Sequence, residues 1–264
     1  MKIALTIAGS DSGGGAGIQA DLKTFQQFGV FGTSVIVALT AQNTLGVRAV
    51  ETVPDSMIAA QLTALAEDLP PAALKTGMLA EASVVRRVAR AIRENGWSPL
   101  VVDPVMVSTS GDRLLTVEAE EVIRDDLLPL AALVTPNTDE AAILTGRVVH
   151  DLATMERAAT TLLRFGVGAV LLKGGHLPAG DIVDVLATPA GVRRFTHPRI
   201  ETTSTHGTGC TLSAAITAGL ALGRPLEAAV AAGLDFVHRA IAAAPNLGAG
   251  HGPLNHTVPA TSAR

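Results

Sequence analysis

The sequence predicts an α/β fold in a single domain, with a mostly parallel central sheet between layers of helices. Short and nearly continuous apolar runs recur along the chain, as expected for strands that are covered on both faces. Amphipathic stretches of helical length separate these runs, and an alternation of strand and helix favours parallel pairing. The 264 residues show no internal repeat and no break in composition, so they fit one large α/β domain.

The pattern places each element. Strands are predicted over residues 2–8, 33–39, 99–103, 131–135 and 168–173. Helices are predicted over residues 16–28, 55–68, 81–94, 116–128, 137–145, 153–165, 207–222 and 225–244. The segment 181–203 differs, because short β-type runs flank its Pro-Ala-Gly turn and predict an antiparallel hairpin at one edge of the sheet. The domain is expected to span residues 1–258, and residues 259–264 to form a disordered tail.

Composition and charge exclude several classes of protein. Hydrophobic residues make up 48% of the chain and charged residues 17%, which is enough apolar material for a sizeable core. The net charge of −4, without a block of like charges, argues against nucleic acid as a partner. No apolar run is long enough to span a bilayer or to serve as a signal peptide, so no membrane partner is expected. The single cysteine, Cys210, excludes an internal disulfide, and we expect a soluble cytoplasmic protein.

Ligands of open α/β sheets bind beyond the carboxyl ends of the strands, and a glycine-rich loop follows the first predicted strand. Five glycines lie between Gly9 and Gly17, where the backbone can approach a ligand and the next helix offers free N–H groups. The loop lacks the Gly-Lys-Ser/Thr ending of a Walker loop. A flexible loop without a ligand is the alternative interpretation.

Acidic residues follow two further strands at the same edge. Asp103 ends one strand, and Asn137 and Glu140 follow the next. Two carboxylates from adjacent strand ends suit a Mg²⁺ ion that keeps several waters and bridges phosphates. The structural alternatives are that Asp103 caps a turn and that Asn137 and Glu140 form a capping box at a helix start.

A lysine and a glycine pair complete the predicted anion-binding edge. Lys173 ends the strand 168–173, where it can meet a phosphate charge, although a solvated lysine is an equal alternative. Gly207 and Gly209 lie at the start of an apolar helix. Exposed N–H groups and the helix dipole at such a start can stabilise a phosphoryl group in transfer, which predicts an anion hole.

Together these segments resemble the ribokinase-like superfamily of ATP-dependent kinases, and within it the hydroxymethylpyrimidine/phosphomethylpyrimidine kinases of thiamine biosynthesis. The residues that carry the resemblance are Leu5 to Lys23, Ala41 to Gly46, Lys75 to Leu79, Val101 to Gly111, Thr135 to Ala141, Leu172 to His176, His206 to Ala214 and Gly250 to His256. The resemblance implies a three-layer α/β/α fold, ATP and Mg²⁺ as cofactors and a homodimer. It also implies phosphorylation of 4-amino-5-hydroxymethyl-2-methylpyrimidine, and then of its monophosphate.

The resemblance also implies roles for individual residues. Hydrogen bonds to the pyrimidine are implied for Asp21 and Gln42, and the planar amide of Gln42 can offer both a donor and an acceptor. The pocket around the ring would be lined by Gly9, Met78 and Val105.

Further implied roles concern the nucleotide, the metal and catalysis. Nucleotide contacts are implied for Asn137, Lys173 and Thr208, metal contacts for Asp103 and Glu140, and catalytic roles for Cys210, Gly207, Gly209 and Lys173.

Two positions bear on how such a kinase would work. Cys210 stands where most of the superfamily has an aspartate base, and a helix N-terminus lowers a thiol pKa. We therefore expect Cys210 to orient the substrate hydroxyl and to accept its proton late. Leu234 stands where relatives often carry a lysine on the nucleotide side, so ATP affinity is expected to differ.

Three alternatives remain at this point. A pyridoxal/pyridoxine kinase of the same lineage is the closest, although the segment Ala41 to Thr44 is of the pyrimidine type. A nucleotide-binding protein without turnover would be expected to lack the anion-hole glycines or the acidic pair. A dinucleotide oxidoreductase is weaker, because the glycines at 13–17 have the wrong spacing.

Overall fold

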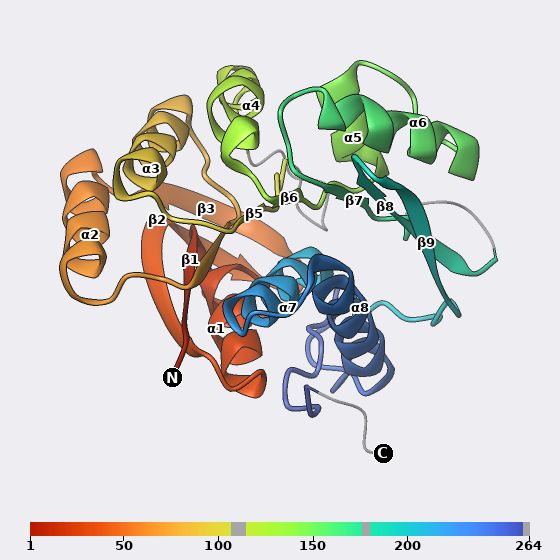
Figure 1. Ribbon diagram of the computed structural model, residues 1–264. Coiled ribbons are helices and arrows are strands. Elements are labelled where there is room, and N and C mark those ends of the chain that lie inside the picture. Colours follow the sequence, from red (N-terminus) through yellow and green to blue (C-terminus); the bar gives the residue numbers. More distant parts are fainter. Residues whose placement is uncertain (107–114, 176–179, 261–264) are drawn as a thin grey trace.

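The computed structural model describes residues 1–106, 115–175 and 180–260 (Figure 1). Nine strands form one sheet in the order β3-β2-β1-β4-β5-β6-β7-β8-β9. The strands are β1 (Ile3–Asp11), β2 (Phe31–Asn43), β3 (Gly46–Thr52), β4 (Ala73–Thr76), β5 (Leu100–Val102), β6 (Leu133–Val134), β7 (Val170–Leu172), β8 (Ile182–Thr188) and β9 (Gly191–His197). The six central strands, from β2 through β1, β4, β5 and β6 to β7, pair in parallel. The edge strand β3 pairs antiparallel with β2, and β8 and β9 pair antiparallel at the other edge.

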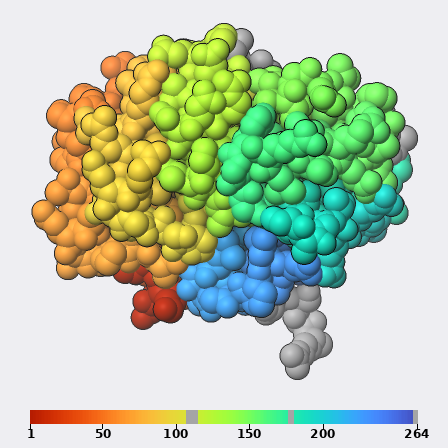
Figure 2. Space-filling view, turned by 45° about the horizontal axis from the view of Figure 1, so that its top comes forward, coloured from red at the N-terminus to blue at the C-terminus, as the bar shows by residue number. Residues whose placement is uncertain are grey.

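Helices cover both faces of the sheet. They are α1 (Gly17–Gln27), α2 (Asp55–Asp68), α3 (Ala82–Asn95), α4 (Val117–Val122), α5 (Thr138–Thr145), α6 (Leu152–Leu163), α7 (Thr208–Ala221) and α8 (Leu226–Ala242). Figure 1 shows α2 to α6 on one face and α1, α7 and α8 on the other. The first group forms a continuous layer, orange through green in Figure 2. Among the described helices, none is long and apolar enough to cross a bilayer.

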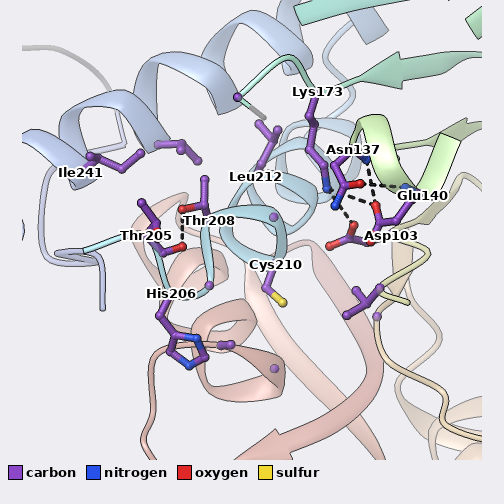
Figure 3. Close-up of a pocket in the computed structure, with 18 of the residues that line it drawn as sticks. Asp103, Asn137, Glu140, Lys173, Thr205, His206, Thr208, Cys210, Leu212 and Ile241 are labelled. Atoms are coloured by element: carbon purple, nitrogen blue, oxygen red, sulfur yellow. Dashed lines mark hydrogen bonds and ion pairs between the residues drawn. The ribbon is translucent and has the colours of Figure 1, made fainter. Parts of the chain in front are cut away.

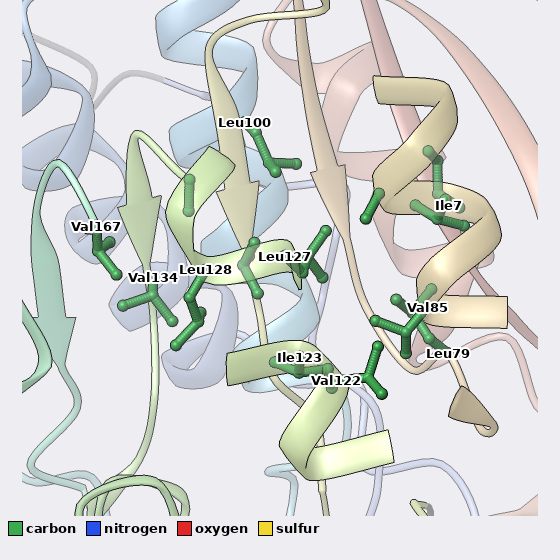
Figure 4. Close-up of a cluster of buried hydrophobic side chains, with 14 of the residues drawn as sticks. Ile7, Leu79, Val85, Leu100, Val122, Ile123, Leu127, Leu128, Val134 and Val167 are labelled. Carbon is green, nitrogen blue, oxygen red and sulfur yellow. The ribbon is translucent and has the colours of Figure 1, made fainter. Parts of the chain in front are cut away.

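The cores on the two faces differ in the residues that fill them. The core under α2 to α6 consists mainly of leucine, valine and isoleucine side chains from strands and helices, such as Ile7, Val85 and Leu127 (Figure 4). The cores under α1, α7 and α8 are richer in alanine, and Phe28 meets Phe236 edge-on with ring centroids 5.3 Å apart. Small side chains on α7 let this helix lie close to the sheet, so its N-terminus reaches the carboxyl ends of the strands.

Most of the predicted elements are confirmed, including the edge hairpin formed by β8 and β9. Two strands were not predicted. The strand β4 has four residues and contains Lys75, which breaks its apolar pattern although the side chain is fully buried. The strand β3 is an exposed edge strand with charged residues, so it lacks the apolar run on which strand prediction depends.

The segment 250–256 joins distant parts of the chain. His251 N–H donates to Thr44 O at 2.8 Å, and the Thr211 hydroxyl lies 2.9 Å from His256 Nε2. Beyond it, Arg239 donates to the carbonyls of Pro259 and Ala260. The first two residues of the predicted tail 259–264 are therefore held by α8, and residues 261–264 lie outside the described part. Residues 107–111 and His176, which belong to the resemblance, also lie outside it.

We expect the protein to lose stability in acid because of His256. Burial beside Lys23 lowers the pKa of His256 to about 4, against 6.5 in the unfolded chain. The contribution of the neutral ring to the free energy of unfolding is therefore complete above pH 6.5. About 3 kcal/mol of it is lost as the pH falls toward 4. Denaturant unfolding at pH 7 and pH 4 measures the change. His256→Gln should remove most of this pH dependence. An equal change in the free energy of unfolding between pH 7 and pH 4 in both proteins would contradict the role of His256.

Candidate active site

One large cavity of about 710 Å³ opens at the carboxyl ends of the central strands. It reaches from the loop after β1 and the end of β2 to the connection after β9 and one face of α8. The N-terminus of α7 lies between these two ends. Every residue given a site role from the sequence lines this cavity except Asp21.

The end of the cavity near β1 and β2 has both apolar and polar walls. Gly9, Gln42, Met78 and Val105 line it. A Cβ atom on Gly9 would lie 2.6 Å from Met78 Cε, so only glycine leaves the methionine side chain in place. The Ser12 hydroxyl donates to Gln42 O at 2.8 Å and accepts from Gln42 N–H at 2.9 Å, which fixes the Gln42 backbone. This end can hold a flat ring with one polar edge.

A lysine between two carboxylates lies in the middle of the cavity (Figure 3). Lys173 Nζ lies 3.2 Å from Asp103 Oδ1 and 3.9 Å from Glu140 Oε2. Burial disfavours the charged lysine, but the two carboxylates raise the pKa of Lys173 above its ordinary value. The ammonium group is therefore permanently charged, and its side chain remains 15% exposed. It can meet a phosphate that enters the cavity.

Asp103 and Glu140 are both held in place by other groups. Asp103 accepts hydrogen bonds from Thr135 Oγ1 at 3.3 Å and Ser213 Oγ at 3.2 Å. Glu140 accepts from Asn137 N–H at 2.8 Å, and Asn137 Oδ1 accepts from Glu140 N–H at 2.8 Å, so the predicted capping box is confirmed. No cluster of three or more metal-ligating side chains is found in the described ranges. Two carboxylates that face one cavity nonetheless suit Mg²⁺, which takes one or two from a protein and completes its shell with water and phosphate.

The N-terminus of α7, where the sequence predicts an anion hole, lies at the cavity. Gly207 adopts a φ of 83°, and a Cβ atom there would lie 1.8 Å from Gly15 O, so no other residue fits. The Thr208 hydroxyl donates to Thr205 O at 2.7 Å and caps the turn. The first N–H groups of a helix have no partner within it, so those of Gly209 and Cys210 face the cavity. A Cβ atom on Gly209 would lie 3.1 Å from Lys173 Nζ, so helix end and lysine meet at one point.

The expectation of a lowered thiol pKa at Cys210 is wrong. Burial raises the pKa of Cys210 to about 12, although the nearby Lys75 and a hydrogen bond from Gly17 N–H oppose the rise. Burial therefore has a larger effect on the thiol pKa than the helix N-terminus. At neutral pH Cys210 is a thiol, which can donate to or contact a hydroxyl but is a poor base.

We expect Cys210 in the folded protein to react with iodoacetamide roughly 50-fold more slowly than a free cysteine at pH 8, because its thiolate is scarce. The greater nucleophilicity of a high-pKa thiolate offsets part of the deficit. Mass spectrometry gives the rate directly, since Cys210 is the only cysteine of the chain. The urea-unfolded protein is the control and should react at the free rate. Equal rates in both states would contradict the raised pKa.

The sequence suggested that the backbone of the glycine-rich loop could approach a ligand, but the N–H groups of residues 13–16 are bonded within the chain. Asp11 accepts hydrogen bonds from the N–H groups of Gly13, Gly15 and Ala16 at 2.8 to 3.0 Å. Gly14 N–H donates to Asp11 O at 3.0 Å. The loop therefore wraps around a carboxylate of its own chain. Burial opposes ionisation, but these bonds and one from His206 hold the pKa of Asp11 below its ordinary value.

Asp21 lies behind the cavity wall rather than in it. Its carboxylate accepts from Lys75 Nζ at 2.8 Å and from Thr6 Oγ1 at 2.6 Å, and both side chains of the ion pair are fully buried. The pair lies close to the lining residues Gly77 and Cys210, because Lys75 Nζ is 3.7 Å from the Cβ position of Gly77 and its charge acts to lower the pKa of Cys210. The structure thus gives Asp21 a buried partner that the sequence could not show.

The other end of the cavity contains residues that sequence reasoning missed. The end of β9 supplies His197, the connection after it supplies the segment 198–202, and α8 supplies Val237, His238 and Ile241. The rings of His197 and His238 stack with centroids 6.0 Å apart. Leu234 is buried in the same apolar wall, where a lysine would otherwise bring charge. The helical spacing of residues 234, 237, 238 and 241 could have indicated that they share one face of α8.

Fold and site together define a class of protein. The sheet order, the helices on both faces and the similarity to solved kinase structures make the chain a ribokinase-like kinase. The chain belongs to the phosphomethylpyrimidine kinase family, because the model with that description matches residues 11–255.

Individual relatives are similar over nearly the whole chain. A hydroxymethylpyrimidine/phosphomethylpyrimidine kinase of Rhizobium meliloti is 52% identical over 96% of each chain. Its Bacillus subtilis counterpart is 47% identical over 96% of this chain and 94% of its own. The crystal structure of phosphomethylpyrimidine kinase from Clostridium difficile has a TM-score of 0.82 at 44% identity and covers 91% of this chain and 100% of that chain. An ADP complex of Bacillus subtilis pyridoxal kinase has a TM-score of 0.91 at 37% identity and covers 97% and 98%.

Proposed function

We propose that the chain transfers the γ-phosphoryl group of ATP to the hydroxymethyl group of 4-amino-5-hydroxymethyl-2-methylpyrimidine, and then phosphorylates the monophosphate to the diphosphate, in thiamine biosynthesis. The observation that carries this proposal is one continuous cavity, with Gln42 at one end, an apolar wall of α8 at the other and the N-terminus of α7 between them. The relatives that carry the two kinase names support the same reaction.

The residues would act mainly by position and charge. The substrate oxygen would attack the γ-phosphorus in line, near the free N–H groups of Gly209 and Cys210. These N–H groups and the Lys173 ammonium would stabilise charge on the transferred group. Such transition states are loose, so little deprotonation of the nucleophile is needed and a thiol at Cys210 suffices.

ATP and Mg²⁺ are proposed as the cofactors. Two solved structures of Staphylococcus aureus pyridoxal kinase, at 32% and 34% identity, hold AMP-PCP, which supports an ATP site in this fold. Asp103 and Glu140 are the residues that would hold Mg²⁺, which would supply neutralising charge at the phosphates. Nucleotide contacts would come from Asn137, Lys173 and Thr208. A homodimer in the cytoplasm completes the proposal.

A pyridoxal/pyridoxine kinase is the second candidate. Pyridoxal kinase structures from Bacillus subtilis and Staphylococcus aureus match this chain with TM-scores of 0.91 and 0.90. The polar edge offered by Gln42 favours the pyrimidine, because a planar amide can pair with an amine and its neighbouring ring nitrogen. The two candidates differ in the ring they bind and not in the chemistry.

The test measures ADP release by the purified protein with Mg²⁺ and ATP. Hydroxymethylpyrimidine, its monophosphate and pyridoxal are offered separately, and products are identified by mass spectrometry. Turnover of both pyrimidines well above that of pyridoxal is expected. Turnover of pyridoxal alone would replace the proposal by the second candidate, and turnover of the first pyrimidine alone would remove the second phosphorylation.

A further inference from the structure

A chain of polar contacts links the glycine-rich loop to the ring pocket. His206 Nε2 lies 2.9 Å from Asp11 Oδ2 and 3.2 Å from Gln42 Nε2. Thr40 Oγ1 lies 3.3 Å from Gln42 Oε1 and 2.9 Å from Ser10 O. Asp11, His206 and Gln42 all line the cavity. In Figure 3, His206 is separated from the Lys173 cluster, with Cys210 between them in this view, so these contacts serve the ring end.

The His206 ring is locked against Asp11. Asp11 is only 2% exposed and is held by three backbone N–H groups of its own loop. A Cβ atom on Gly15 would lie 2.6 Å from His206 Cδ2, so glycine lets the ring close on the carboxylate. On the backbone, His206 N–H donates to Gly252 O at 3.1 Å. Neither partner can turn away without breaking several buried bonds.

The donor and acceptor roles of these polar groups favour one orientation of the Gln42 amide. An ionised carboxylate only accepts, so His206 Nε2 must carry its proton and donate to Asp11. A donor at His206 Nε2 cannot receive a hydrogen bond from the Gln42 NH₂ group. The Thr40 hydroxyl has one proton, which Ser10 O takes, so Thr40 Oγ1 is an acceptor toward Gln42. The one proton of His206 Nε2 is already donated to Asp11, so it attracts the Gln42 amide without forming a second full hydrogen bond. Turning the amide over, with oxygen toward His206 and nitrogen toward Thr40, removes the contact between two donors at His206 and gives Thr40 Oγ1 an N–H to accept.

We propose that Asp11 and His206 are positioning residues that fix the amide of Gln42 in this orientation, and thereby set the order of donor and acceptor offered to the substrate ring. One N–H of Gln42 and one lone pair of its oxygen then remain for the ligand. They match an exocyclic amine beside an unprotonated ring nitrogen. A ring with a carbonyl in place of the amine and a protonated ring nitrogen needs the reverse order and is rejected. This inference rests on the proposed pyrimidine kinase activity.

The experiment compares two substrates in three proteins. The substrates are the aminopyrimidine and its 4-oxo analogue, and the readout is the ratio of their kcat/KM values. Wild type should prefer the amine by about 100-fold or more, since two hydrogen bonds are mismatched in the analogue. His206→Leu should reduce this ratio at least tenfold and raise the KM of the aminopyrimidine, with the KM of ATP unchanged. His206→Gln, which can still donate to Asp11, should keep most of the ratio.

The outcomes separate the inference from the proposed function. If the ratio of kcat/KM values is unchanged in His206→Leu, even with an equal loss of kcat/KM on both substrates, His206 has only a structural role and the inference is overturned. If His206→Leu does not fold, the nearly isosteric Thr40→Val removes the other anchor of the amide, and its ratio should also fall, by about threefold; an unchanged ratio there overturns the inference equally. Wild-type inactivity on both pyrimidines would instead overturn the proposed function, and the inference with it.

Discussion

Replacing Lys173 with methionine is expected to lower kcat by about a hundred- to a thousandfold, the usual cost of removing one preorganised donor from a charged transition state. The ammonium group lies between Asp103 and Glu140 and meets the N-terminus of α7 at Gly209, where the transferred group would be. Steady-state kinetics with Mg²⁺, ATP and hydroxymethylpyrimidine give the value. The KM of the pyrimidine should change little, because Lys173 lies away from the ring pocket.

A matched variant controls for loss of a lysine in general. Lys2 is exposed at the N-terminus, so Lys2→Met should keep wild-type kcat. Circular dichroism should show that Lys173→Met is folded. A kcat within tenfold of wild type in a folded Lys173→Met protein would contradict a catalytic role for this lysine.

Replacing Asp21 with asparagine is expected to destabilise the protein by about 3 to 5 kcal/mol, because it leaves the fully buried charge of Lys75 without its partner. Denaturant unfolding at pH 7 measures this loss. The double variant with Asp21→Leu and Lys75→Met should recover much of it, since two apolar side chains of similar volume leave no buried charge.

The same variant decides whether Asp21 also contacts the substrate. If its role is to pair with Lys75, Asp21→Asn should change stability far more than the KM of the pyrimidine. Unchanged stability with a large rise in this KM would restore the direct contact that the resemblance implied. Asp55→Asn is a suitable control, because Asp55 makes a solvent-exposed ion pair with Arg87 and such pairs contribute little.

Elements with a clear local pattern could be predicted from the sequence. The amphipathic period predicted α2 at residues 55–68, as found, and the capping residues Asn137 and Glu140 predicted the start of α5. The strand β4 was missed because the burial of Lys75 depends on Asp21, which is 54 residues away in the sequence. The burial of a charged residue in a short strand can be predicted only when its partner is known.

Most residues to which the sequence gave a site role line one cavity, whereas the chemistry of several of them differs from the expectation. Residues beyond the strand ends converge because parallel strands share one carboxyl edge, which topology alone dictates. The behaviour of the individual groups depends on burial and on distant contacts. Thus the thiol pKa of Cys210 moves opposite to the expectation from its helix position, and N–H groups of the glycine loop are bonded to Asp11. Neither environment can be read from neighbouring residues in the sequence.

The contact between Asp11 and His206 also has a consequence for how the protein is made. It joins residues 195 positions apart, and Gln42 meets His206 across 164 positions. At ordinary rates of synthesis, His206 leaves the ribosome about 10 to 40 s after Asp11. The strands and helices of the amino-terminal half can form in that interval, but the ring pocket cannot. Binding competence is therefore a late event in biogenesis, and a prematurely terminated chain would be unable to capture the vitamin precursor.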